Sequence, residues 1–131
     1  MNVIKYRDPL VLMLDTINDR KKTLILYELE RTKKQAYEVA AALPHMQREE
    51  ISSELASLVE MGLVARKIHV RKQPHYVEYA LTNEGAMLLR SVQTIMDIGI
   101  HVMLQYGMEG VLEEHGYIEH TDHAAKEAQP V

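Results

Sequence analysis

The chain has 131 residues, of which 47% are hydrophobic and 26% charged, the composition of a single globular domain. It contains no cysteine, which excludes disulfides, thiolate metal sites and thiol redox chemistry. It also lacks a signal peptide and a run of about 18 uncharged apolar residues, so we expect a cytoplasmic protein without a membrane span.

The net charge of −4 is distributed unevenly. Six acidic residues and one basic residue follow position 108, a net of −5 that leaves +1 for residues 1–108. We predict that residues 1–108 form the folded domain with its dimerisation helices, and that residues 109–131 form a short acidic helix and a mobile tail. Residues 62–77 hold no acid and four strong cations: Arg66, Lys67, Arg71 and Lys72.

The first half of the chain has helical signals. Asp8 followed by Pro9 predicts a helix start, because Asp is favoured as N-cap and Pro at the first helical position. Apolar spacing predicts three further helices, over residues 23–31, 36–43 and 47–61. Pro44 separates the last two, and Gly62 stands at the position after a helix where glycine is favoured.

The second half changes period. Residues 63–70 and 76–81 are rich in β-branched and aromatic residues, and the polar turn between them contains Pro74, which predicts a hairpin. Thr82 is the expected cap of a long helix that ends near Gln105. Val111 and Leu112 mark a short final helix.

The order of these elements predicts the fold class. Three helices, a turn, a helix, a hairpin and a long helix form a mainly α winged helix-turn-helix with added N- and C-terminal dimerisation helices. In this fold the second helix of the helix-turn-helix enters the major groove of DNA, and the basic wing lies near the phosphate backbone.

Several short sequence motifs resemble a known family. They are residues 23–26 (TLIL), 42–44 (ALP), 62–64 (GLV) and 77–82 (VEYALT), with Gly85. With these motifs, residues 9–100 resemble the HxlR family of bacterial and archaeal regulators. The resemblance implies a homodimeric transcription regulator joined through its terminal helices. The chain departs from the family at Lys21, where Trp is usual, and near Asp8, where Cys is usual.

The DNA contacts are predicted on three segments. Arg and Gln side chains pair with guanine and adenine, and cations pair with phosphates. The candidates are Lys33, Lys34, Gln35, Gln47, Arg48, Glu49, Ser52, Ser53, Arg66, His69, Arg71, Lys72 and Gln73. The predicted recognition helix also carries four acids, Glu49, Glu50, Glu54 and Glu60, which repel phosphates. The alternative is therefore a winged-helix interaction module that has lost DNA binding.

The dimer interface is predicted from apolar residues at spacings of three and four in the long helix, close to a coiled-coil seam. The alternative for this stripe is intramolecular core. The candidates, which include the first helix, are Leu10, Met13, Leu14, Leu88, Val92, Ile95, Met96, Gly99, Val102, Met103 and Tyr106. Adaptable methionine side chains leave room for a small-molecule effector at the seam.

Metal binding and catalysis find little support. His115, His120 and His123 lie near Glu119 and Asp122, but their spacing matches no known ligand pattern, and a mobile tail is a poor metal cage. The sequence contains no catalytic triad context, phosphate loop or zinc-protease motif. We expect no metal, no cofactor and no enzyme activity.

Overall fold

The computed structural model describes residues 1–119. The chain forms two compact units, and the boundary lies between Val92 and Gln93. The division falls within the long helix α5 (Asn83–Gln105). The reason is packing, because Leu88, Leu89 and Val92 are buried with the first unit while the later turns of α5 are largely exposed.

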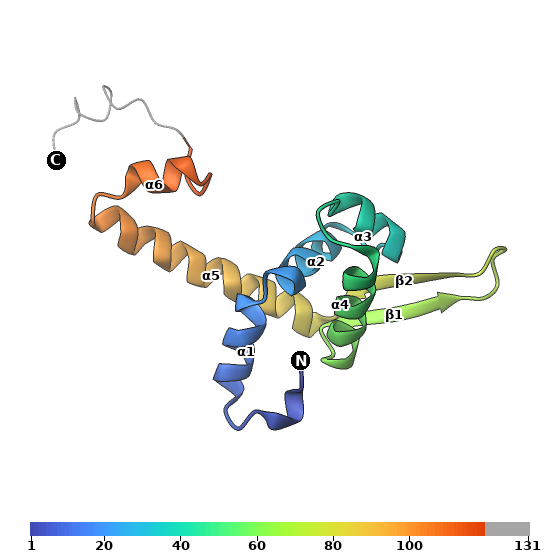
Figure 1. Ribbon diagram of the computed structural model, residues 1–131. Helices are drawn as coiled ribbons and strands as arrows, with labels where there is room; N and C mark the ends of the chain where they lie inside the picture. Colours follow the sequence, from blue (N-terminus) through green and yellow to red (C-terminus); the bar gives the residue numbers. More distant parts are fainter. Residues whose placement is uncertain (120–131) are drawn as a thin grey trace. The chain divides into compact units, whose positions relative to one another are not determined.

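The first unit begins with a short 3-10 turn and four helices (Figure 1). Their bounds are η1 (Val3–Lys5), α1 (Pro9–Asn18), α2 (Arg20–Arg31), α3 (Ala36–Ala42) and α4 (Arg48–Glu60). Asp8 caps α1 as predicted, since its Oδ1 accepts a hydrogen bond from the backbone N–H of Leu10 at 2.8 Å. Helix α2 starts earlier than residue 23 because Asp19 caps it, accepting from the backbone N–H of Lys22 at 3.3 Å.

The predicted hairpin consists of β1 (Val64–His69) and β2 (Tyr76–Leu81), paired antiparallel with Val64 opposite Leu81. In Figure 1 it projects beyond α3 and α4. The backbone of Lys34, between α2 and α3, exchanges two hydrogen bonds with Tyr79, with N···O distances of 2.7 and 2.9 Å. This extra pairing holds the base of the wing against the helix-turn-helix. The structure thus confirms the predicted mainly α winged helix-turn-helix fold.

The core of the first unit lies between α2, α3, α4 and the start of α5. Its buried side chains include Ile25, Leu26, Val39, Ile51, Leu55, Leu58, Leu63, Val64, Leu88 and Leu89. A Cβ at Gly85 would lie 2.2 Å from the carbonyl oxygen of Leu63, so only glycine permits this close approach. Thr82 caps α5 as predicted, accepting from the N–H of Gly85 at 3.1 Å and donating to the carbonyl of Gly62 at 2.6 Å.

The second unit contains the rest of α5 and the short helix α6 (Glu109–Glu114), whose Leu112 is buried. His115 and Tyr117, which we predicted to lie in the tail, instead complete the end of α6 through backbone hydrogen bonds to Val111 and Leu112. The remainder of the predicted tail, residues 120–131, lies outside the described residues.

Helix α5 is also the one helix within residues 1–119 that is long and apolar enough to cross a membrane. A single helix of this kind is weak evidence for a membrane span, because the core helix of a globular protein can have the same length and hydropathy. Leu88 and Leu89, in its first turns, are core residues of the first unit.

Candidate nucleic-acid interface

Helix α4 has an exposed side and a buried side. Ile51, Leu55 and Leu58 face the core, as the apolar spacing predicted. The other side is exposed, and it carries Arg48, Glu49, Ser52, Ser53 and Ala56. Gln47, which precedes the helix, is exposed too. The structure therefore places the predicted base-contacting residues together on one free surface at the N-terminal part of α4.

Glu50 does not belong to this exposed surface. Its carboxylate forms an ion pair with Lys21 of α2 and accepts a hydrogen bond from the backbone N–H of Gln47 at 3.1 Å. These two interactions, with Lys21 contributing most, lower the pKa of Glu50 below its ordinary value. Lys21 is the position where the resemblance leads one to expect Trp, and here the lysine is accommodated by an acidic partner on α4.

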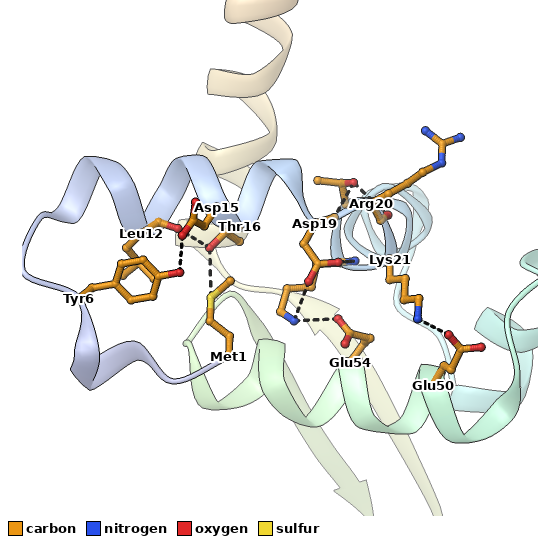
Figure 2. Close-up of polar contacts among 12 residues, drawn as sticks. Met1, Tyr6, Leu12, Asp15, Thr16, Asp19, Arg20, Lys21, Glu50 and Glu54 are labelled. Atoms are coloured by element: carbon orange, nitrogen blue, oxygen red, sulfur yellow. Dashed lines mark hydrogen bonds and ion pairs between the residues drawn. The ribbon is translucent and has the colours of Figure 1, made fainter.

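Glu54 is also directed toward α2. Its Oε2 lies 2.8 Å from Nζ of Lys22, which also lies 3.2 Å from Oδ2 of Asp19 (Figure 2). The Lys22 side chain is only 3% exposed. Burial disfavours its charged form, but the hydrogen bonds to Glu54 and Asp19 outweigh that effect and raise the pKa of Lys22. Two of the four acids of α4 are thus neutralised away from the exposed side.

The candidates before α3 serve mainly local structure. Lys34 is mostly buried, and its Nζ donates to the carbonyl oxygen of Glu28 at 2.8 Å. The backbone N–H of Gln35 donates to the Glu38 carboxylate at 3.0 Å, which satisfies the start of α3. Lys33 is exposed, with its Nζ 3.8 Å from Glu78. Lys33 presents its charge to solvent, whereas the Lys34 ammonium is occupied by Glu28 of α2.

The wing carries unpaired cations, both on β1 and in the turn between the strands. Arg66, Lys67, Arg71, Lys72 and the polar Gln73 are exposed. Within residues 1–119, none of these four cations forms an ion pair. Both the outer side of β1 and the turn of the wing therefore have charge available for phosphates.

At the end of the strands next to the turn, His69 packs against β2. In His69, a predicted DNA-contacting residue, Nε2 is buried 2.6 Å from Oε1 of Glu78, and the ring stacks on Tyr76 with centroids 4.3 Å apart. Glu78, directly after the acid-free residues 62–77, supplies an acidic side chain to the hairpin. Antiparallel register explains both contacts of His69, because it puts Lys67 opposite Glu78 and His69 opposite Tyr76 on the same face.

Sequence analysis missed Tyr37. It lies in the first turn of α3, and 60% of the residue is exposed. Together with Arg48 and Ser52 of α4 it lines an open hollow of about 270 Å³. The available signal was an aromatic residue at the second position of the first helix of a helix-turn-helix, outside its apolar stripe.

The predicted dimer stripe divides between two environments. Leu88 and Val92 are buried in the first unit and so belong to its own core. Leu10 and Leu14 of α1 are exposed and Met13 is half-buried. In the second unit, Ile95, Val102 and Tyr106 are exposed, while Met96, Gly99 and Met103 line an apolar hollow of about 210 Å³ together with Leu112 and Tyr117.

No group of three or more His, Cys, Asp or Glu side chains within residues 1–119 is arranged to hold a metal ion. Of the histidine cluster considered above, His120, Asp122 and His123 fall outside that range.

Comparison with known proteins identifies this architecture. Residues 16–106 match the HxlR-like helix-turn-helix family. A transcriptional regulator of the MarR family from Enterococcus faecalis V583 is 28% identical, with a TM-score of 0.68 over 75% of this chain and 88% of that one. The redox regulator HypR in its reduced form is 26% identical, with a TM-score of 0.62 over 72% and 92%.

The reduced form of the transcriptional regulator YodB from B. subtilis shares the fold at 22% identity, with a TM-score of 0.64 over 70% of this chain and 90% of that one. Curated proteins compared by sequence give no match.

Proposed function

Because this chain belongs to the HxlR-like helix-turn-helix family, we propose that it regulates transcription by binding specific sequences of double-stranded DNA as a homodimer. That it is a transcriptional regulator of the helix-turn-helix type follows from the family and from its structural neighbours. Sequence-specific DNA binding and the homodimer are the parts of this function that we propose beyond the family assignment. The expected location is the cytoplasm, where a DNA-binding regulator of a prokaryote meets its target.

The observation that carries DNA binding is the distribution of charge around α4. Glu50 and Glu54 are neutralised by lysines of α2, so the exposed side keeps Arg48, two serines and only Glu49 as an acid near the N-terminal end. Small serines permit close approach to base edges, and Arg48 supplies the donors that guanine accepts. The cationic wing tip adds sequence-independent contacts to phosphates.

The homodimer is supported by unpartnered apolar surface. Leu10, Val11 and Leu14 of α1 are each at least 46% exposed, and Ile95, Ile98 and Val102 of α5 at least 47%. Apolar surface of this extent on a small protein marks an interaction site. A symmetric dimer would place two recognition helices about 34–36 Å apart, one turn of DNA, on a near-palindromic site.

The test of DNA binding is selection from a pool of random duplexes, followed by gel-shift titration of the selected sites at several salt concentrations. We expect a near-palindromic site and an affinity that falls steeply as salt rises. Arg48→Ala should weaken binding and reduce discrimination between sites. If no sequence is enriched even at low salt, the proposed function is wrong.

The test of the dimer is sedimentation of the wild type and of Val102→Glu, which introduces charge into the exposed apolar stripe. We expect a dimer for the wild type and a monomer with much weaker DNA binding for the variant. The matched control is Gln93→Glu, which introduces the same side chain at a polar exposed position of α5 and should remain dimeric. A monomeric wild type would contradict this part of the proposal.

The second candidate function is a protein-interaction module that does not bind DNA. Glu49 favours it, because an exposed carboxylate beside Arg48 repels phosphates. Recovery of a protein partner without DNA in a pull-down, combined with a failed selection, would support this function.

The apolar hollow in the second unit is the place where we would seek a small-molecule effector. Its lining by Met96, Gly99 and Met103 leaves space for an apolar ligand. HypR is described as a redox regulator, but the absence of cysteine from this sequence leaves no thiol to carry such a signal here. Ligand-induced change in DNA affinity is the corresponding measurement.

A further inference from the structure

The hollow beside the recognition helix joins the N-terminal turns of α3 and α4. Six residues line it: Ala36, Tyr37 and Ala40 from α3, and Arg48, Ile51 and Ser52 from α4. Its volume is about 270 Å³, and it is open to solvent. The exposed residues Arg48 and Ser52 belong at the same time to the surface that we propose for base contacts. The hollow and the proposed base-contacting surface are therefore continuous.

The lining of the hollow is mainly apolar. The side chains of Ala36, Ala40 and Ile51 are hydrocarbon, and that of Tyr37 has an aromatic ring. Polar atoms of side chains come from the guanidinium of Arg48 and the hydroxyls of Ser52 and Tyr37. Such walls favour an apolar group over a phosphate, which requires several donors aimed at it.

Of the groups that DNA presents in its major groove, one is apolar: the 5-methyl of thymine. Alanine side chains are suited to contact it because they are small and carry no polar atom. The hollow is larger than one methyl group, so it also has room for the edge of the pyrimidine ring. Arg48 at its rim carries donors for the base stacked beside the thymine, and guanine offers two acceptors there.

We propose that this hollow binds the 5-methyl group of a thymine in each half-site, so that Tyr37 and Ala40 of α3 determine sequence specificity together with Arg48 of α4. The base beside that thymine is a guanine contacted by Arg48. This inference rests on the proposed DNA-binding function and names the base step that the protein distinguishes.

The first experiment uses a site obtained by selection from random duplexes. Each thymine of one half-site is replaced in turn by deoxyuridine, which removes the 5-methyl group and nothing else, and the dissociation constant is measured by fluorescence anisotropy. We expect one replacement per half-site to weaken binding about fourfold, and the symmetric pair about 15-fold, as for burial of one methyl group each. The other replacements should have little effect.

The second experiment changes the hollow. Ala40→Leu fills it and should abolish the difference between thymine and uracil at the sensitive position. Ala41→Leu, the same change at an exposed residue of α3 outside the hollow, should retain it. Tyr37→Ser removes one wall without adding volume to the core, so it provides an independent variant if Ala40→Leu does not fold. It should reduce the thymine preference.

The outcomes separate this inference from the function on which it rests. Specific binding in which every thymine tolerates uracil, or an Ala40→Leu protein that keeps the thymine preference, would overturn the inference and leave the DNA-binding proposal intact. Failure to select any sequence would overturn both.

Discussion

Two groups of basic side chains in the first unit differ in their surroundings. On α2, Lys21 and Lys22 are each matched by an acid of α4, and Lys22 is buried. At the wing tip, Arg71 and Lys72 are exposed and have no acidic partner within the described part of the chain. The four residues are equivalent in a count of charge, yet only the second pair has charge to offer a ligand.

The difference shows why the net charge of the chain is a poor guide to its function. A lysine between two packed helices must have a partner, because burial of an isolated ammonium is very costly. A side chain at the end of a projecting hairpin remains hydrated and free to bind phosphate. Ion pairs between α2 and α4 also direct Glu50 and Glu54 away from the exposed side of α4, which leaves two of its four acids, Glu49 and Glu60, exposed.

The largest effect on stability is expected from removing the Glu54 partner of the buried Lys22 ammonium. Glu54→Leu removes the nearest partner of Lys22 and leaves Asp19, whose carboxylate is 3.2 Å away. We expect the free energy of unfolding to fall by about 3 kcal/mol, the lower part of the range for a buried pair that loses one member, because Asp19 still accepts from the ammonium. Urea denaturation measures this change.

The control for this substitution is Glu49→Leu. It removes the same acid at an exposed position of the same helix, where no ion pair is present within residues 1–119. Its effect on unfolding should stay within about 0.5 kcal/mol. Equal effects of the two substitutions would show that Glu54 contributes no more than a solvated surface acid.

The same buried group predicts a loss of stability in alkali. The pKa of Lys22 is raised above its ordinary value of 10.5 in the folded protein. Its stabilising contribution is therefore complete below pH 10.5 and is lost as pH rises through the folded-state pKa. Unfolding free energies between about pH 9 and pH 12 should decline more steeply for the wild type than for Lys22→Met, which has no amine to titrate there. Parallel curves would contradict the prediction.

Sequence patterns predicted the features that depend on neighbouring residues. Asp8, Thr82 and Gly62 mark helix ends through local hydrogen bonding or backbone conformation, and all three stand where expected. The exposed side of α4 followed from its apolar spacing, since burial of Ile51 and Leu55 fixes which residues face solvent.

Features that depend on tertiary packing were not predictable in the same way. Lys22 and Glu54 are 32 residues apart, and only the packing of α2 on α4 brings them together. His69 meets Glu78 because of the hairpin register, which composition does not determine. The apolar stripe of α5 has one period throughout, so spacing could not distinguish the core residue Leu88 from the exposed Ile95.

A smaller effect is expected from removing a cation of the wing tip. Lys72→Ala should lower the slope of log affinity for the selected DNA against log salt by about one, since one phosphate contact releases about 0.9 counterion. Stability should not change. The control is Lys5→Ala, an exposed lysine of η1. If both variants reduce the slope equally, net charge rather than the position of the wing controls binding.

The smallest effect is on stability at low pH, and it comes from the ion pair between Lys21 of α2 and Glu50 of α4. Lys21 and the backbone N–H of Gln47 lower the pKa of Glu50 below 4.5. The contribution of Glu50 to the free energy of unfolding is then complete above pH 4.5 and is lost as pH falls through the folded-state pKa. Between about pH 6 and pH 3 the wild type should lose more stability than Lys21→Ala, in which the carboxylate keeps only the Gln47 hydrogen bond. Because both partners reach solvent, salt should reduce this difference, whereas it should leave the effect of the buried Lys22 pair largely unchanged. A difference that persists in high salt would place Lys21 with Lys22 as part of one buried network.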